Sequence, residues 1–567
     1  MKKYSNITIV LIIIVLAASA IRLYDLPRGD VVSDEVLYGF RAIGYLDFDF
    51  AIAQPSTLQL FDGDIPAWTK LSFHDHPPLV FLVQHWFINL IGSNNLGMRL
   101  PSALFGIATV LLMYFIGKRL FSERAGVIAA GLMAMNVLMV YVSRTGVQEA
   151  QVLFFEMLTA YLFLRAREDP RWFLATGAAF GLALLSKYTA AFLVIPLIVY
   201  LLLSRRDVFR KWHVYGGIVL ALLIFSPVII YNILLFKTFA HFDFQLSYIF
   251  GQDVSYWQVT PGKEIGSLLE RLSGIGTNLW FFNSLVFNIF TSITLVATGL
   301  YLIRWKRRER KEREAIVLIL IGIASLLLMY AFIGPAARFL AMLIPWLSLL
   351  VAFGLSAITT HLRRSIRIAF YFFIAAIIAW EGLFAINSYV LERPIGEEVV
   401  HYSRIHWDAH TWGFNVLDEY LETMLAGSYP VQTTGYTLPW LNNIRRIAIQ
   451  RGIDQGRKPL SVLFVYNDNA ANLAMLWAVS RRALYEGWAM MPIESYQRTL
   501  DEEGENFFRS QGFEKFFFIQ NTDAILLNQP ERITSAGDLF EATLSGIDPH
   551  ELTNHDGQVV FRIYEFE

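Results

Sequence analysis

The chain has 567 residues, of which 55% are hydrophobic and only 17% are charged, and its formal net charge is -1. A chain this apolar is typical of membrane proteins, because a soluble domain does not bury so large a share of hydrophobic side chains. The near-neutral charge gives no attraction to nucleic acid. The absence of cysteine excludes disulfide bonds, thiolate metal sites and cysteine nucleophiles.

The first apolar run, Ile7 to Ala20, follows two lysines and ends in Ala-Ala-Ser-Ala. This pattern fits a cleavable signal peptide as well as an uncleaved membrane span. We favour the span, because the chain continues with apolar runs that approach or exceed the roughly 17 to 25 residues a helix needs to cross hydrocarbon. Ile316 to Ile333 and Ile366 to Ile386 are two of the clearest.

The strongest topology signal is Arg304 to Glu314, which holds seven Lys and Arg residues between two apolar runs. The positive-inside rule places this segment in the cytoplasm. Counting spans from it in both directions puts these basic connectors on the same side: Gly117 to Arg124, Arg165 to Arg171, Ser204 to Lys211 and His361 to Arg367. The count predicts about eleven spans, within a range of about eleven to thirteen, with the N-terminus inside and the C-terminus outside.

The apolar stretch Leu79 to Ile91 does not fit this alternation as a crossing segment. It is only about 13 residues long, which is short for a span, and it contains Gln84, His85 and Asn89. We therefore expect an interfacial helix on the outer surface, within a first external loop over residues 24–100.

The predicted topology gathers polar residues in external loops or at outer span ends. They are Asp34, Glu35, His74, Asp75, His76, Arg144, Glu149, Lys187, His241 and Arg338. The cytoplasmic side offers only basic connectors, so we expect the function to reside on the outer face.

Asp34 and Glu35 stand before a segment with helical apolar spacing, Val36 to Tyr45. The helix dipole favours carboxylates at such an N-terminus, and Ser33 or Asp34 can act there simply as the helix cap. The local sequence alone favours the cap over a catalytic acid.

His74, Asp75 and His76 open the short helix, followed by two prolines that fix its entry. Two histidines and an aspartate are ligand types that bind divalent metals. Their spacing is too short for all three to converge easily, so a metal site needs a partner from elsewhere, such as Asp34, Glu35 or His241. The alternative is a hydrogen-bonded polar start of the helix.

Arg144, Glu149, Lys187 and Arg338 all lie near the ends of predicted spans. A single charge in that position often only reaches toward the lipid headgroups. Several charges of both signs on one side of the membrane favour a functional site instead.

Seven motifs follow one another along the chain. They are D-E-x-x-Y from Asp34, H-P-P-L from His76, R-L-P-S-A-L-x-G from Arg99, G-K-R-L-F from Gly117, S-R-x-x-x-x-E from Ser143, G-L-A-L-L-S-K-Y-T from Gly181 and R-F-L-x-x-x-x-P from Arg338. In this order they resemble the GT-C type of membrane glycosyltransferases, and most of all the protein O-mannosyltransferase and aminoarabinose-transferase superfamily. The similarity extends from Ile21 to Leu355.

The resemblance implies that a sugar is transferred from a polyprenyl-phosphate carrier to a lipid, glycan or protein acceptor at the outer face, with inversion at the anomeric carbon. Asp34 matches the family's first-loop aspartate, the general base that takes the proton of the acceptor hydroxyl. Arg144, Lys187 and Arg338 are the candidates to bind the leaving phosphate. Glu149 matches the family's second acidic position and is expected to be catalytic together with Asp34, by orienting a basic partner or the acceptor.

The same resemblance gives supporting roles to further residues. Glu35 and His76 are expected beside the catalytic groups. Asp75 and His241 are the candidate ligands of a divalent metal, because some relatives place a metal-binding histidine in the loop of His241. No other cofactor is expected.

The composition changes near residue 391. Residues 1–390 are expected to form the transmembrane catalytic domain, and residues 391–567 a C-terminal extracytoplasmic α/β domain with strands at Ser461 to Tyr466 and Val559 to Tyr564. The protein is expected in the cytoplasmic (plasma) membrane, with its active site and C-terminus outside.

Two other function classes remain open, a transporter or flippase of a lipid-linked sugar and a non-catalytic assembly subunit. The odd span count, the absence of an inverted repeat and the lack of ionisable residues deep inside the spans weigh against the transporter.

Overall fold

The computed structural model describes residues 6–50, 53–61, 64–259, 266–303, 310–467, 474–525 and 535–567. The chain divides into two compact units. Unit 1 is Met1–Pro27, Ile52–Pro55 and Ala67–Asp408, and unit 2 is Arg28–Ala51, Ser56–Pro66 and Ala409–Glu567. Unit 2 therefore combines two segments of the first loop with the C-terminal region. The domain boundary expected at residue 390 stays a prediction.

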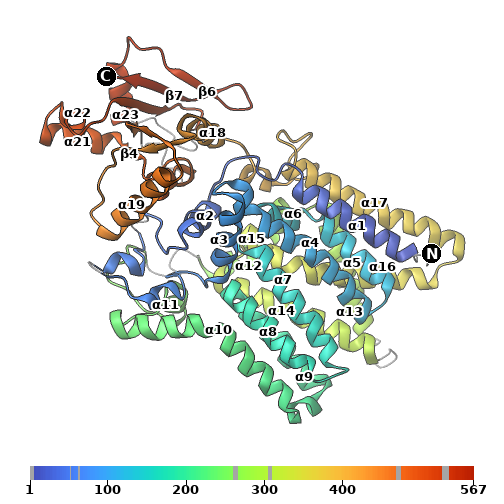
Figure 1. Cartoon of the computed structure of the whole chain (residues 1–567). Helices are drawn as coiled ribbons and strands as arrows, with labels where there is room; N and C mark the ends of the chain where they lie inside the picture. The colour runs from blue at the N-terminus through green and yellow to red at the C-terminus, as the bar shows by residue number, and fades with distance from the viewer. Residues whose placement is uncertain are drawn as a thin grey trace. The chain divides into compact units, whose positions relative to one another are not determined.

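Unit 1 is helical throughout its described part. Its α-helices are α1 (Asn6–Leu23), α3 (Leu79–Ile91), α4 (Asn95–Leu120), α5 (Glu123–Met135), α6 (Val137–Arg144), α7 (Glu149–Ala166), α8 (Trp172–Ser186), α9 (Val194–Ser204), α10 (Trp212–Phe239), α11 (Phe244–Phe250), α12 (Leu268–Phe282), α13 (Leu285–Ile303), α14 (Arg310–Ile333), α15 (Ala337–Leu340), α16 (Ile344–His361) and α17 (Arg364–Tyr389). Short 3-10 helices are η2 (Ala67–Lys70), η3 (Tyr188–Leu193), η4 (Arg206–Arg210), η6 (Ala341–Leu343) and η7 (Arg404–Asp408). In Figure 1, α4 lies between α5 and α7, which both pack against it.

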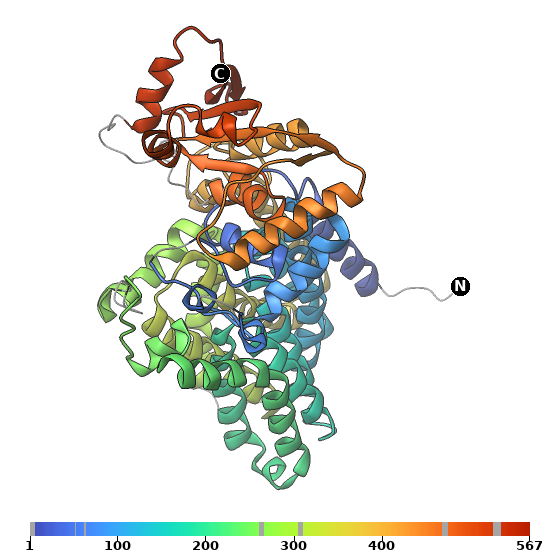
Figure 2. The same cartoon turned by 60° about the vertical axis from the view of Figure 1, so that its left-hand side comes forward.

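Apolar side chains cover the outer faces of these helices as well as the interior. Ile9, Leu223 and Phe372 are exposed examples from α1, α10 and α17. Helices that are hydrophobic all round are typical of a bilayer environment. Figure 2 shows α8 and α10 (residues 172–186 and 212–239) running side by side within unit 1, in cyan-green and green.

Six described helices are long and apolar enough to cross a membrane, or seven if the bent pair α5 and α6 forms one span. This confirms a polytopic membrane protein. Each of the segments expected to cross is helical in its described part, but α8, α13 and the pair η3 and α9 are shorter apolar helices, and α7 is not among the candidate spans either. The count of about eleven therefore stays a prediction. The short helix α3 has the expected bounds, and its place at the membrane surface also stays a prediction.

The connectors predicted to be cytoplasmic lie together at one end of unit 1. Arg119 bonds Glu168 at 2.7 Å, and Arg167 bonds Glu314 at 2.7 Å. Arg205 donates to the carbonyl of Arg167 at 2.9 Å. Four of the basic connectors thus share one end of the helical bundle, as an alternating topology requires. The side of the membrane that this end faces stays a prediction.

A bend of 59° separates α5 from α6. Asn136 begins α6, and its side-chain oxygen accepts hydrogen bonds from the N–H groups of Leu138 at 3.1 Å and Met139 at 3.4 Å. Its amide donates to Asn283 at 2.8 Å. Backbone groups freed by a break inside lipid need such partners, so Asn136 both ends one helix and caps the next.

The last turn of α5 receives its partner from α1. The fully buried Arg22 donates to the carbonyls of Ala134 at 2.8 Å and Met133 at 3.4 Å. Gly106 of α4 makes room for this contact, since a Cβ there would lie 2.1 Å from Ser143 Oγ and 3.2 Å from Arg22 Nε. This close approach explains the glycine that ends the R-L-P-S-A-L-x-G motif.

Unit 2 is built on a five-stranded sheet in the order β4-β3-β5-β7-β6. Its strands are β3 (Val462–Tyr466), β4 (Ala489–Pro492), β5 (Lys515–Asn521), β6 (His550–Thr553) and β7 (Val559–Phe566), and a parallel pair is formed by β1 (Ser428–Pro430) and β2 (Lys458–Leu460). β3 pairs in parallel with β4 and β5, whereas β7 is antiparallel to β5 and β6. Both strands expected from the sequence are present, as β3 and β7.

Helices cover both faces of this sheet. The helices of unit 2 are α2 (Asp34–Gly44), η1 (Thr57–Leu60), α18 (Phe414–Leu425), α19 (Pro439–Asp454), the π-helix η8 (Leu476–Ser480), α20 (Arg481–Tyr485), α21 (Ile493–Glu503), α22 (Phe507–Ser510) and α23 (Ala536–Thr543). Val462 and Phe464 of β3 join one hydrophobic cluster, and Leu463 and Val465 join the other. Burial on both faces accounts for the continuous apolar run in β3. Unit 2 has an α/β architecture, and its extracytoplasmic position stays a prediction.

A buried aspartate ties the first loop to the C-terminal region inside unit 2. The carboxylate of Asp30 accepts hydrogen bonds from the N–H groups of Trp412 at 2.7 Å, Gly413 at 3.1 Å and Asn415 at 2.7 Å. These donors lie at the start of α18, where helix N–H groups lack internal partners. The loop segment thus belongs structurally to unit 2.

Candidate functional site

Glu149, Lys187 and Arg338 meet within unit 1, although they come from three separate elements. Glu149 is the first residue of α7, where the helix dipole favours a carboxylate. Lys187 directly follows α8, and its Nζ donates a hydrogen bond to Glu149 Oε1. Arg338 of α15 approaches the same oxygen, with Nε at 3.8 Å. The structure thus brings three of the predicted site residues together.

The pair of Glu149 and Lys187 is shielded from solvent, whereas Arg338 is partly exposed. The side chain of Glu149 is 0% exposed and that of Lys187 is 8% exposed. The ring of Phe339 lies 4.6 Å from Lys187 Nζ and 5.1 Å from the guanidinium carbon of Arg338, which places both cations at a single aromatic ring. Glu149 Oε2 is buried without a hydrogen-bond partner among the described residues. The cluster thus presents two cations side by side, and lysine and arginine are side chains that bind anions such as phosphate.

A second carboxylate extends the cluster. Asp408, the last residue of η7, accepts a hydrogen bond from Tyr141 of α6 and interacts with the charge of Arg338. Burial raises the pKa of Asp408, while Tyr141 and Arg338 act in the opposite direction. Sequence reasoning missed Asp408 because it lies far along the chain from Arg338, in an aromatic-rich segment that carries no motif.

Arg144 has a different environment from the one expected. Its guanidinium donates to the carbonyls of Ile21 at 2.7 Å, Tyr24 at 2.8 Å and Asp25 at 3.2 Å, and so binds the C-terminal end of α1. Carbonyls at a helix C-terminus lack internal donors and attract cations. The contacts give Arg144 a structural role next to the site, and a phosphate contact stays a prediction.

Asp75 lies between its two neighbouring histidines. Asp75 Oδ2 is 3.0 Å from Nδ1 of His76, and Oδ1 is 3.9 Å from Nδ1 of His74. The carbonyl of His74 accepts a hydrogen bond at 2.6 Å from the N–H of Phe244, which joins this segment to the loop of His241. A carboxylate flanked by imidazoles is a donor set that suits a divalent metal.

His241 does not offer a nitrogen to such a metal as it stands. Its Nδ1 lies 2.5 Å from the carbonyl oxygen of Phe242, and its Nε2 is bonded to the hydroxyl of Tyr256. Burial lowers the pKa of His241. The nearby Asp243 accepts hydrogen bonds from Tyr188 at 2.6 Å and from Asn232 at 2.8 Å. The metal role of Asp75 and His241 stays a prediction, and binding at His241 requires the loss of one of its present bonds.

Asp34 and Glu35 begin α2, and Glu35 is buried. Ser33 stands at the N-cap position, but its side chain makes no capping hydrogen bond. Its φ of 57° is a left-handed conformation that is uncommon outside glycine. Asp34 and Glu35 belong to unit 2, whereas Glu149, Lys187 and Arg338 belong to unit 1. The catalytic role of Asp34 stays a prediction.

The expectation that the spans lack deep ionisable residues is wrong. Glu156 lies in the middle of α7, and Glu381 lies inside α17, where it accepts a hydrogen bond from Ser284 at 2.8 Å. Both side chains are buried within unit 1. This removes one of the arguments against a transporter.

Known proteins match the chain in sequence and in fold. The family model of dolichyl-phosphate-mannose-protein mannosyltransferase matches residues 75–231. YkcB and YycA of Bacillus subtilis, both named as candidate mannosyltransferases, are 28% identical over 37% of the chain and 30% identical over 38% of it. These matches cover only 28% and 30% of the two relatives' own lengths.

The fold extends the likeness over nearly the whole chain. ArnT from Cupriavidus metallidurans, solved bound to undecaprenyl phosphate, matches with a TM-score of 0.51 at 14% identity and covers 98% of this chain and 97% of its own. Its apo structure matches with the same TM-score at 13% identity. The family model, the relatives and the fold together confirm the resemblance to the GT-C superfamily of membrane glycosyltransferases.

Proposed function

We propose that the protein transfers a sugar from a polyprenyl-phosphate donor to a lipid, glycan or protein acceptor at the outer face of the cytoplasmic membrane, with inversion at the anomeric carbon. The observation that carries this proposal is the buried cluster in which Lys187 and Arg338 surround Glu149 and share the ring of Phe339. ArnT, which shares the fold, was solved with a polyprenyl phosphate bound.

The two cations act on the leaving group. When the bond between the anomeric carbon and the phosphate oxygen breaks, the lipid phosphate takes both electrons and gains negative charge. Lys187 and Arg338 stabilise that charge, with arginine able to bind two oxygens at once. The low exposure of the cluster strengthens these interactions relative to water. Glu149 holds the cations in place until the phosphate arrives.

Asp34 acts on the acceptor. The attacking hydroxyl must lose its proton as it forms the new bond to the anomeric carbon, and a carboxylate within hydrogen-bond reach takes that proton. Two observations support Asp34 in this role: its match to the first-loop D-E-x-x-Y motif, and the left-handed backbone of Ser33 just before it. Strained backbone of this kind is concentrated at functional sites.

The first test concerns Asp34. The protein is reconstituted with a panel of labelled polyprenyl-phosphate sugars, and release of free polyprenyl phosphate is measured. Asp34→Asn should lower release by about 100-fold or more, because it removes the general base. Asp64→Asn, which alters an exposed acid of the same loop, should release as much as the wild type. Full activity of Asp34→Asn refutes the role of Asp34, and movement of the donor across the bilayer without release supports a transporter.

The second test concerns the cations. Removing Lys187 alone takes the hydrogen-bonded cation from the buried Glu149 and leaves it only Arg338 at 3.8 Å, which destabilises the protein by up to about 3 to 5 kcal/mol. The double variant Lys187→Met with Glu149→Gln removes both charges and avoids that penalty. We expect it to fold and to bind undecaprenyl phosphate at least about tenfold more weakly. A loss of this size corresponds to one charge-assisted hydrogen bond. Unchanged binding shows that the pair is only structural.

A further inference from the structure

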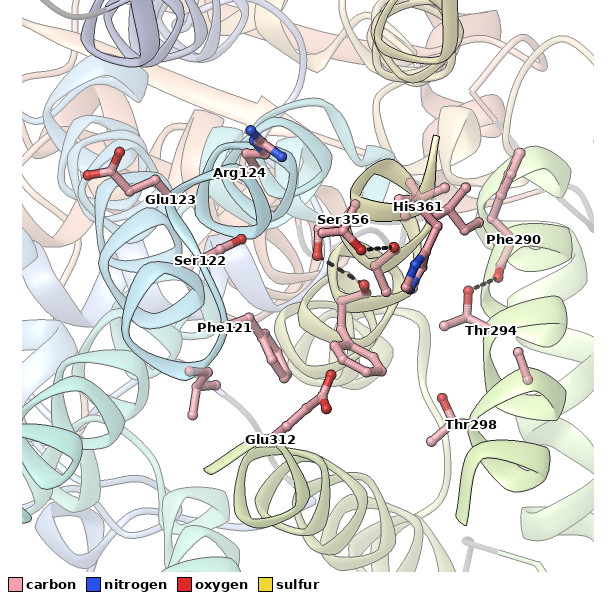
Figure 3. A pocket seen from close by; sticks show the side chains of 18 of the residues that line it. Phe121, Ser122, Glu123, Arg124, Phe290, Thr294, Thr298, Glu312, Ser356 and His361 are labelled. Atoms are coloured by element: carbon pink, nitrogen blue, oxygen red, sulfur yellow. Dashed lines mark hydrogen bonds between the residues drawn. The ribbon is translucent and has the colours of Figure 1, made fainter. Parts of the chain in front are cut away.

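A groove of about 950 Å³ lies in unit 1, away from the cluster described above. Figure 3 shows it between α13, α16 and the turn that joins α4 to α5. Its wall is largely apolar, with Phe290 and Ile293 from α13, Phe121 from the turn and Phe353 from α16. A groove of this volume and lining suits a hydrocarbon chain.

The groove opens at the end of unit 1 that carries the basic connectors. Its lining includes Ser122 to Arg124 from the first basic connector and Lys311 and Glu312 from the fourth, at the start of α14. Thr360 and His361 line it at the end of α16, where the fifth connector begins. The sequence predicts all of these connectors to lie in the cytoplasm. The mouth of the groove is therefore at the predicted inner surface of the membrane.

The outer wall of the groove faces the bilayer. Ile293 lines the groove and is 59% exposed, and Ala297, one helical turn further, is also exposed. The inner wall is tight, since a Cβ at Gly354 of α16 would lie 3.0 Å from Thr294 Cγ2. An acyl chain that enters from the lipid side therefore contacts the protein on one side and stays open to the bilayer on the other.

Positive charges line the mouth. Arg124 and Lys311 are exposed, and neither has an ion-pair partner among the described residues. His361, on the last turn of α16, also lines the groove. The acidic residues of the lining are Glu123, which is held by Lys118 at 2.7 Å, and Glu312. The charge that is available at the mouth is thus mainly positive.

We propose that this groove binds an anionic phospholipid of the cytoplasmic leaflet. The phosphate lies at Arg124 and Lys311, and one acyl chain occupies the apolar groove between α13 and α16. Basic pockets between membrane helices on the cytoplasmic side recognise such headgroups, and anionic lipids are concentrated in that leaflet. The donor cluster lies at the ends of the helices that the topology places outside, so this is a separate lipid site.

The test measures lipid retention by native mass spectrometry of the full-length protein. Phosphatidylglycerol is the anionic probe, and phosphatidylcholine is the neutral one. The wild type should retain the anionic lipid preferentially. In the double variant Arg124→Gln with Lys311→Gln, retention of the anionic lipid should fall about fivefold for each charge removed. The matched pair Arg171→Gln with Lys211→Gln removes two exposed charges of other basic connectors and should retain the lipid as the wild type does.

A second variant tests the groove itself. Ala297→Phe fills the groove from an exposed position and leaves every charge in place, so it should lower retention of phosphatidylglycerol without lowering the melting temperature. Equal retention of the two phospholipids by the wild type, or an equal loss in the matched control pair, overturns the proposal. Displacement of phosphatidylglycerol from the wild type by equimolar undecaprenyl phosphate assigns the groove to the carrier lipid instead and also overturns it.

Discussion

The pair of Glu149 and Lys187 poses an energetic question at the scale of single residues. Burying two charges costs several kcal/mol in desolvation, and such a pair is often replaced by apolar side chains without loss of stability. The third charge, Arg338, lies close to a second cation, and the carboxylate of Asp408 interacts with it. A bound phosphate would give both cations a further negative partner, which is a functional reason for keeping them at this place.

Glu149→Gln tests this balance. The substitution leaves Lys187 and Arg338 without their shared carboxylate, so we expect the free energy of unfolding to fall by about 3 kcal/mol. Undecaprenyl phosphate should restore much of that loss, because its phosphate takes the place of the carboxylate. The measurement is the thermal melting temperature with and without the lipid phosphate. If the lipid raises the melting temperature of the variant no more than it raises that of the wild type, this account is contradicted.

Short motifs around Glu149, Lys187 and Arg338 made these residues predictable from the sequence, and the structure brings them together. Asp408 was not predictable, because its partners Tyr141 and Arg338 are close only in the folded chain. Arg144 shows the reverse case. Its motif pointed to a ligand contact, but its guanidinium binds the carbonyls at the end of α1, a backbone interaction that leaves no signal in the sequence.

At the scale of elements, the apolar runs predicted the helices well because length and composition alone decide whether a segment can cross a membrane. The break at Asn136 was not predictable in the same way. Residues 125–142 read as one apolar run with a single asparagine, and only the partners of that asparagine reveal two helices at 59° to each other.

Asn136→Leu should weaken this junction. It removes the cap of α6, worth about 1 kcal/mol, and leaves Asn283 without its donor, at a cost of about 1 to 3 kcal/mol. Because α6 carries Tyr141, we also expect slower sugar transfer. Asn136→Ser keeps a capping oxygen and should recover about half of the lost stability. Thermal melting of the purified variants provides the measurement, and equal stability of the leucine and serine variants argues against a capping role.

At the scale of the whole molecule, the number of spans decides on which side of the membrane each loop lies. The count of about eleven includes α13, whereas the length criterion leaves it out. Between Ser255 and Ser545 the larger count places four crossings, formed by α13, α14, α16 and α17, and the smaller count places three. An even number of crossings puts the two serines on the same side of the membrane, and an odd number puts them on opposite sides.

The lack of native cysteine makes this difference directly measurable. Ser255→Cys, Ser545→Cys and Arg171→Cys each place one thiol at an exposed position. With eleven spans, a membrane-impermeant maleimide added to intact cells should label the first two variants, and should label Arg171→Cys only after permeabilisation. If Ser255→Cys is labelled in intact cells and Ser545→Cys is not, α13 does not cross the membrane. Labelling of Arg171→Cys in intact cells would reverse the orientation and would place the cluster of Glu149, Lys187 and Arg338 at the cytoplasmic face.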